Sequence, residues 1–305
     1  MSDRLLIIGG TGFIGRNLSL SAVKQGYKVV VLSLHSPNVE KRVNNVEYLQ
    51  ADISCFTELK EKIGDDNFEY IVNLSGYINH CNFSDGGKKV IDVHFGGVQN
   101  ILQSVNLDSL KRFVQIGSSD EYGNLSAPQT EDMRESPISP YSLGKVASTQ
   151  LLQMLYSTEG LPTVILRLFL VYGPGQDLRR FIPQVIQGCL SSGYFPTSAG
   201  DQLRDFCYVD DITNGILMTL KNDKVNGKVI NLASGKSIRI REVVELVQKT
   251  IGEGKADFGK IPYRTGENMA LYADISEANR ILEWEPATSI EEGVKRTIDY
   301  YQRKN

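Results

Sequence analysis

Short apolar runs alternate with segments of helical pattern over the first half of the chain. The apolar runs are rich in Val, Ile and Leu and predict strands at residues 5–8, 28–32, 46–49, 70–74, 113–116 and 163–168. The segments between them predict helices at 12–25, 56–63, 88–105 and 140–159. Strands that are apolar along their whole length, with helices between them, are typical of a parallel sheet covered on both faces. The pattern therefore predicts an α/β fold built on a Rossmann-type, doubly wound parallel sheet.

After residue 168 the alternation of apolar runs and helical segments becomes less regular. We expect, in chain order, a helix at 182–190, a loop without strand period at 191–204, a helix at 209–221, a buried strand at 228–232 and a mostly helical tail. This organisation predicts a dinucleotide-binding domain of residues 1–168 plus about 205–235. The remaining residues, 169–204 and 236–305, are expected to form a smaller, interleaved C-terminal substrate-binding cap. The ligand should lie in the cleft between sheet and cap.

Composition and charge exclude several classes of partner. The 305-residue chain carries 33 basic and 36 acidic residues, and its net charge of −3 gives no general attraction for nucleic acid. The four cysteines, Cys55, Cys81, Cys189 and Cys207, form no C-x-x-C pair, so we expect no metal site. The sequence has no long apolar stretch and no leader pattern, which predicts a cytoplasmic protein without a membrane partner.

A glycine-rich turn joins the first strand to the first helix. Gly9, Gly12 and Gly15 form G-x-x-G-x-x-G, in which small residues let the backbone approach a phosphate and let the helix pack closely on the strand. The amino end of the helix can then hold a pyrophosphate. We expect the cofactor to contact Gly9, Thr11, Gly12, Phe13, Ile14 and Gly15. The alternative is a glycine-rich turn without a ligand.

The end of the second strand lacks the acidic residue that usually binds the adenosine ribose. Residues 31–36 read Val-Leu-Ser-Leu-His-Ser. A 2′-phosphate, which a carboxylate would repel, could be accepted here by Ser33, His35, Ser36 and a nearby cation, Lys41 or Arg42. The sequence therefore favours NADP(H) over NAD(H). The alternative is that the basic residues only solvate a loop.

Tyr141 and Lys145 stand four residues apart in the helix predicted at 140–159, so both side chains can reach one pocket. Ser139 and Pro140 suit the N-cap and first position of that helix. A phenol titrates near pH ~10, and a close ammonium favours the phenolate. A Y-x-x-x-K pair alone is common on protein surfaces. Together with the glycine turn, it predicts a proton relay beside a hydride carrier.

Three polar residues follow the strand predicted at 113–116. Ser118, Ser119 and Asp120 should therefore lie at the carboxyl edge of the sheet, where ligands bind. A serine hydroxyl there can hydrogen-bond a substrate oxygen that alternates between carbonyl and alcohol. Asp120 could act as an acid or base, or it could only cap a turn.

Eight segments, taken in order, resemble motifs of one known family. They are residues 9–15, 51–53, 73–76, 118–123, 140–145, 166–175, 204–211 and 264–267. With these segments the chain resembles, over nearly all its length, the extended short-chain dehydrogenase/reductases of the nucleotide-sugar epimerase/dehydratase family.

The resemblance implies roles for particular residues. Ser118, Tyr141 and Lys145 would form the catalytic set, and Lys145 would also hold the nicotinamide ribose. Asp52 and Ile53 would lie near the adenine, and the segment Leu74, Ser75 and Gly76 would contact the cofactor. Ser118, Ser119, Arg204 and Arg264 would bind a nucleotide-diphosphate sugar, with the arginines on its diphosphate. The alternative for each arginine is a salt bridge within the cap.

The resemblance also implies a homodimer. Helices near 88–105 and 140–159 would pair with those of a second subunit.

The chain departs from the family pattern at three positions. Leu170 and His94 each stand where relatives usually have an asparagine, one near the diphosphate and one near the catalytic region. Ser119 stands where dTDP-glucose dehydratases have an aspartic acid that protonates the leaving hydroxyl, whereas GDP-mannose dehydratases, which use NADP, have serine there.

These observations favour an NADP(H)-dependent reductase of a nucleotide-activated 4-keto-6-deoxy hexose. The alternative is a nucleotide-sugar 4-epimerase or 4,6-dehydratase that keeps NAD(P) tightly bound. A further alternative is a non-catalytic binding or regulatory protein on the same fold.

Overall fold

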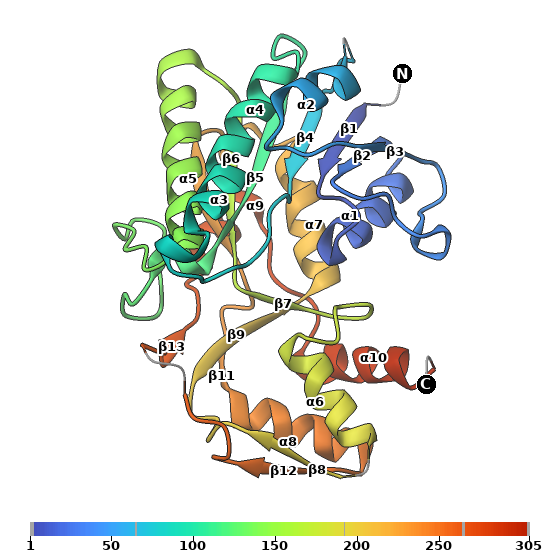
Figure 1. The fold of residues 1–305 in the computed structure, drawn as a ribbon, viewed down its shortest axis with the longest axis vertical. Coiled ribbons are helices and arrows are strands. Elements are labelled where there is room, and N and C mark those ends of the chain that lie inside the picture. Colours follow the sequence, from blue (N-terminus) through green and yellow to red (C-terminus); the bar gives the residue numbers. More distant parts are fainter. Residues whose placement is uncertain (1–2, 65, 192, 264–265, 304–305) are drawn as a thin grey trace.

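A parallel sheet of seven strands forms the centre of the computed structural model, which describes residues 3–64, 66–191, 193–263 and 266–303 (Figure 1). The strand order is β10-β6-β5-β4-β1-β2-β3, and every pair is parallel. The strands are β1 (Arg4–Ile8), β2 (Lys28–Ser33), β3 (Val46–Gln50), β4 (Tyr70–Asn73), β5 (Arg112–Ser118), β6 (Thr163–Leu168) and β10 (Lys228–Leu232). The fold class and these strands agree with the sequence analysis.

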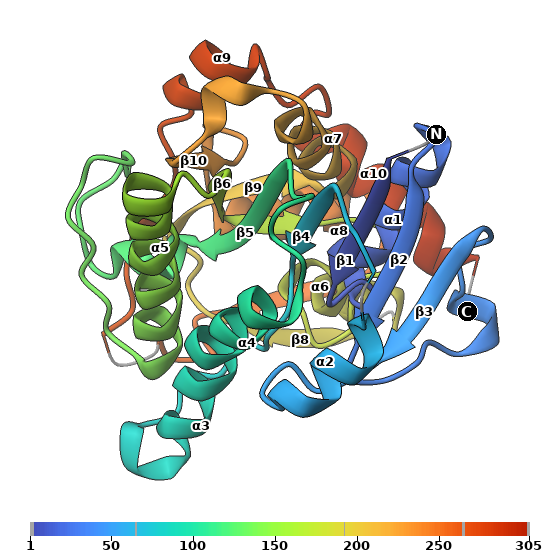
Figure 2. The same ribbon diagram turned by 90° about the horizontal axis from the view of Figure 1, so that it is seen from above.

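Helices cover both faces of the sheet (Figure 2). One face packs against α1 (Phe13–Lys24), α7 (Val209–Leu220) and α9 (Ser276–Leu282). The other face packs against α2 (Phe56–Ile63), α4 (Gly97–Ser104) and α5 (Pro140–Glu159). Because both faces are covered, the central strands are apolar without alternation, as the sequence pattern indicates.

Local signals set the limits of α5. The Ser139 side chain accepts the Ser142 N–H at 3.1 Å, and Pro140 occupies the first turn. Gly160 ends the helix in the left-handed region at φ 71°, which a residue with a side chain rarely adopts. The predicted bounds of this helix are therefore confirmed.

The single helix predicted at 88–105 is wrong in one respect. The segment consists of α3 (Gly87–Ile91), a π-helical turn η3 (Asp92–Gly96) and α4. The spacing of apolar residues in the sequence does not reveal one wider turn inside a continuous helix, because the helical turns on either side of it still bury their apolar residues with ordinary α-helical spacing.

The cap lies beyond the carboxyl edge of the sheet (Figure 1). Its core contains side chains from α6 (Phe181–Leu190), α8 (Ile240–Ile251) and α10 (Ile290–Gln302). Its strands are β7 (Leu170–Tyr172), β8 (Tyr194–Thr197), β9 (Leu203–Tyr208), β11 (Ser237–Arg239), β12 (Lys255–Phe258) and β13 (Ala270–Leu271). Short 3-10 turns lie at η1 (Val39–Lys41), η2 (Phe83–Asp85), η4 (Ser119–Tyr122) and η5 (Asp223–Val225).

Two predictions for the cap are corrected here. The segment 191–204, expected to lack strands, contains β8 and the start of β9. The tail, expected to be mostly helical, contributes β11, β12 and β13. These strands are short and partly exposed, so they lack the buried apolar run that identifies the central strands. In the parts of the chain that the structure describes, no helix combines the length and apolar character needed to cross a bilayer.

Candidate active site

A cavity of about 800 Å³ lies between the carboxyl edge of the sheet and the cap. Its walls come from the turn after β1, the loop after β4, the end of β5, the first turns of α5 and the segment 168–184. This volume falls in the range of small-molecule and cofactor sites, about 300–1,000 Å³. The cavity therefore joins the predicted cofactor turn to the predicted catalytic residues.

The glycine turn forms one end of the cavity. Gly9 has φ +79°, and a Cβ added to it would lie 2.9 Å from the backbone of Leu74. Gly12 is the N-cap of α1 and supplies no side-chain cap, and the first-turn residues Phe13, Ile14 and Gly15 line the cavity. The first amides of α1 thus present the positive end of a helix to the cavity, which suits a pyrophosphate. Thr11 does not line the cavity but donates its N–H to Ser33 Oγ at 3.2 Å.

The residues expected to accept a 2′-phosphate contact the glycine turn and β3. Ser33 is buried, His35 is exposed, and Ser36 Oγ donates to Gln50 Oε1 at 3.2 Å. The Arg42 guanidinium lies 5.4 Å from the ring centroid of Tyr48. A cation that the sequence analysis missed, Arg16, joins this region by donating Nε–H to the Lys41 carbonyl at 3.1 Å.

The residues predicted near the adenine and nicotinamide separate into two groups. Asp52 caps a turn, because its Oδ1 accepts the N–H and the hydroxyl of Ser54 at 2.8 and 2.7 Å. Ile53 is buried against Gly97. Neither residue lines the cavity, whereas the segment Leu74, Ser75 and Gly76 does. The adenine contact of Asp52 and Ile53 stays a prediction.

Ser118, Tyr141 and Lys145 also line the cavity. The Ser118 hydroxyl hydrogen-bonds the Tyr141 phenol. Lys145 Nζ donates to the Ile116 carbonyl at 2.8 Å and lies 6.0 Å from the centroid of the Tyr141 ring. The three residues predicted to be catalytic are therefore neighbours.

Burial controls the protonation of this cluster. It raises the pKa of Tyr141 above its ordinary range, with only partial opposition from the Ser118 hydrogen bond. The net effect is a raised pKa of this phenol, whereas the sequence predicted a lowered one. Burial also lowers the pKa of Lys145 to about 8, although the charge of Glu121 opposes that effect. Both groups thus favour their neutral forms more than they would in water.

A buried ion pair that the sequence analysis missed holds Ser118 in place. Glu121 is fully buried, and its Oε1 accepts the Ser118 N–H at 2.8 Å. Its other oxygen accepts Arg167 Nε–H at 3.0 Å and the Thr149 hydroxyl at 2.9 Å. Both charged residues lie in motif segments of the sequence, but nothing in the sequence says that they face each other.

Asp120 lies beside a histidine that the sequence analysis also missed. Asp120 Oδ2 is 3.5 Å from His80 Nε2, and the His80 ring centroid is 5.5 Å from that of Tyr141. Burial raises the pKa of Asp120, while the charges of His80 and Arg204 oppose that effect. A carboxyl group that holds its proton more tightly than usual is suited to acid/base work. The adjacent Ser119 is buried.

The two arginines predicted to clamp the diphosphate have different outcomes. Arg204 forms an ion pair with Glu267 and donates to the Leu203 carbonyl at 2.9 Å, which corresponds to the salt-bridge alternative. Arg264 lies outside the described residues. Two cations that the sequence analysis missed, Arg179 and Arg180, line the cavity, and Arg179 pairs with Asp177 at 2.7 Å.

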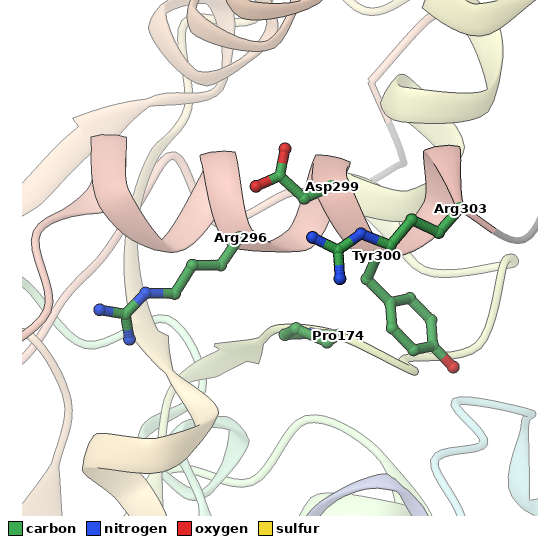
Figure 3. Close-up of a pocket in the computed structure, with 5 residues that line it drawn as sticks. All are labelled: Pro174, Arg296, Asp299, Tyr300 and Arg303. Carbon is green, nitrogen blue, oxygen red and sulfur yellow. The ribbon is translucent and has the colours of Figure 1, made fainter.

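A second hollow of about 390 Å³ lies on α10 (Figure 3). It is lined by Pro174, Arg296, Asp299, Tyr300 and Arg303, and none of the predicted site residues is among them. Because it contains none of the residues of the sequence motifs that predict the catalytic and cofactor sites except Pro174, it does not compete with the larger cavity as the candidate site.

Comparison with known proteins gives one family and many similar structures. The model of the NAD dependent epimerase/dehydratase family matches residues 5–233. A UDP-glucuronate 4-epimerase of Thermodesulfobacterium geofontis is 29% identical over 97% of this chain and 95% of its own length.

Two solved structures are similar over 99% of this chain. One is an epimerase of Methanothermobacter thermautotrophicus, 26% identical with a TM-score of 0.90 over 93% of that chain. The other is the UDP-glucuronic acid 4-epimerase of Bacillus cereus in complex with UDP-glucuronic acid and NAD, 26% identical with a TM-score of 0.85 over 100% of that chain.

Proposed function

The chain belongs to the NAD-dependent epimerase/dehydratase family, and we propose that it is a nucleotide-sugar 4-epimerase that keeps NAD bound throughout its reaction. The observation that supports the proposal is that one cavity is lined both by the glycine turn, which would accept a pyrophosphate, and by Ser118, Tyr141 and Lys145. Relatives that are themselves 4-epimerases of UDP-sugars support this reaction.

Two expectations from the sequence are not supported. The reductase favoured there gives way to the epimerase alternative, because similar proteins include UDP-sugar 4-epimerases as well as dehydratases and a decarboxylase. The preference for NADP(H) also lacks support, since the similar structure of UDP-glucuronic acid 4-epimerase holds NAD.

The residues at the glycine turn fit a dinucleotide. Gly9 leaves room where a Cβ would meet the Leu74 backbone, and the first amides of α1 face the same space. Lys145 would hold the nicotinamide ribose. A bound nicotinamide would supply reversible hydride transfer at the sugar C4 carbon.

The protein residues would handle the proton. Tyr141 would take the proton of the 4-hydroxyl during oxidation and return it during reduction, while Ser118 would orient the same oxygen. Lys145, with a pKa of about 8, is mostly charged at neutral pH and would favour the phenolate during oxidation. Arg179 and Arg180 line the cavity and would bind the diphosphate.

The test is a panel of UDP-, dTDP-, CDP- and GDP-hexoses, each incubated with the purified enzyme without added coenzyme. We expect conversion of a UDP-hexose to its 4-epimer, with NAD released when the protein is denatured. In a parallel incubation with added NADPH or NADH and a nucleotide-activated 4-keto sugar, consumption of the coenzyme would instead establish the reductase. Binding of nucleotide sugars without conversion would favour the non-catalytic alternative.

One observation favours a second candidate, a 4,6-dehydratase. Asp120 lies 3.5 Å from His80 beside Tyr141 and could abstract a proton from the carbon next to a 4-keto group. Product mass separates the two candidates, because a dehydratase product has lost one water and an epimer has not.

The predicted homodimer is retained as part of the proposal. Leu143 and Met154 are exposed apolar side chains on α5, one of the two helices expected at the interface. Sedimentation analysis should give twice the mass of one chain, and a monomer at micromolar concentration would contradict it.

A further inference from the structure

We propose that His94 is a positioning residue that holds the Tyr141 ring and the loop after β4 against the cavity, through ring packing and an Nε2–H donor. The proposal rests on the proposed function, because the position of Tyr141 matters only if its phenol handles the proton. His94 lines the cavity and is only 4% exposed.

The imidazole contacts two walls of the cavity. Its ring centroid is 4.9 Å from that of Tyr141, with the planes at 84°, which is the edge-to-face arrangement that aromatic rings prefer. Its Nε2 lies 3.0 Å from the carbonyl oxygen of Tyr77, in the loop after β4. One side chain therefore couples the candidate proton donor to the loop that borders the coenzyme space.

The backbone around His94 is shaped for this ring. Gly76 has φ +107°, and a Cβ added there would lie 2.1 Å from His94 Cε1. A Cβ added to the backbone of Gly144 in α5 would lie 2.9 Å from His94 Cβ. The Ser148 hydroxyl donates to the His94 carbonyl at 3.0 Å. Both neighbouring segments thus lack a side chain where the imidazole packs.

His94 occupies the middle of the π-helical turn η3. Such turns are rare and often mark functional sites, because the extra residue changes the direction of one side chain without ending the helix. Here the wider turn carries the residue whose ring packs edge-to-face against Tyr141.

The protonation state of His94 agrees with a role as hydrogen-bond donor to the Tyr77 carbonyl. Burial and the nearby charge of Lys145 lower the pKa of His94 to about 3, and the hydrogen bond to the Tyr77 carbonyl only partly opposes them. At neutral pH the ring is therefore uncharged. Because a carbonyl can only accept, Nε2 carries the proton.

Three variants separate the two contacts. His94→Phe keeps a ring against Tyr141 but loses the N–H, His94→Gln keeps an N–H donor but loses the ring, and His94→Leu loses both. Loss of the ring should lower kcat by about 100-fold, the effect of a misplacement of about 1 Å. We therefore expect kcat to fall with His94→Gln, and coenzyme affinity, measured by fluorescence titration, to fall with His94→Phe. His94→Leu should show both losses. Values within twofold of wild type for all three variants would overturn the proposal.

A measurement without turnover keeps this test independent of the reaction. The chain has only three histidines, so imidazole ¹⁵N resonances can be assigned with the His94→Phe variant. We expect one imidazole to remain in the neutral Nε2–H form at pH 5. If His94 becomes charged near its ordinary pKa of 6.5, the proposal fails. Wild-type protein without epimerase activity would refute the proposed function, while the coenzyme titration and the resonances would still decide the role of His94.

Discussion

Replacing Lys145 by Met should stabilise the ligand-free protein at neutral pH while abolishing turnover. Lys145 is buried, and burial lowers its pKa from 10.5 to about 8. At about 1.36 kcal/mol for each pH unit, keeping its charge in the folded state costs about 3 kcal/mol. Met cannot make the hydrogen bond that Lys145 donates to the Ile116 carbonyl, and this loss costs about 1 kcal/mol. The free energy of unfolding should therefore rise by about 2 kcal/mol in the Lys145→Met variant. The Ile116 carbonyl keeps a donor in Gln115 at 3.2 Å.

The gain in the free energy of unfolding should decrease as the pH rises above 8. Below pH 8 the lysine is charged in both the folded and the unfolded state, and the wild type carries the full penalty. Between pH 8 and 10.5 the unfolded state binds more protons, so the free energy of unfolding of the wild type rises with pH. Lys145→Met lacks this group, so its advantage should shrink over that window.

Urea unfolding between pH 7 and 9.5 measures this difference, with the fluorescence of Trp284, the single tryptophan, as the signal. Lys249→Met on α8 is the matched control, because this lysine is exposed. Its free energy of unfolding should stay within about 0.5 kcal/mol of wild type at every pH. A Lys145→Met protein less stable than wild type at pH 7, or a difference that does not change with pH, would refute the reasoning.

Three further predictions concern the two ends of the cavity. Tyr141→Phe should lower kcat by about 10²–10⁴-fold while coenzyme affinity is kept, and steady-state rates near wild type would count against Tyr141 as the proton donor. Gly9→Ala should lower the free energy of unfolding by about 1–3 kcal/mol and weaken coenzyme binding, because φ is +79° and the new Cβ would lie 2.9 Å from the Leu74 backbone. Urea unfolding measures the first effect and fluorescence titration the second. Unchanged values would refute the idea that Gly9 lets the backbone approach the coenzyme closely. Ser33→Asp places a carboxylate on the last residue of β2 and should reduce NADP(H) affinity relative to NAD(H) by about tenfold or more; an unchanged affinity ratio would mean that the ribose lies elsewhere.

Local signals made the central sheet and α5 predictable. β1 and β2 are buried along nearly their whole length, so their composition alone identifies them. Ser139, Pro140 and Gly160 mark the ends of α5 by chemistry that acts within a few residues. β8 and β12, in contrast, are short, partly exposed and paired across about 60 residues of sequence, and no local pattern encodes that pairing.

The same distinction applies to the site. Tyr141 and Lys145 come together through helix spacing, and Ser118 joins them because its strand ends beside that helix, so the sequence could predict all three. His80 and Arg180 reach the region through the path of loops, and Glu121 through a buried ion pair with Arg167. These contacts depend on tertiary packing between segments far apart in the chain, which the sequence pattern does not specify.

The most direct test of the proposed reaction follows one hydrogen atom. UDP-glucose and UDP-glucuronate labelled with deuterium at C4 are incubated with the enzyme without added coenzyme, and the C4 position of the product is read by NMR and mass spectrometry. Reversible transfer within one active site predicts a 4-epimer that retains its deuterium, with no net change in nicotinamide absorbance. Loss of the label to solvent, or stoichiometric formation of reduced coenzyme, would contradict it.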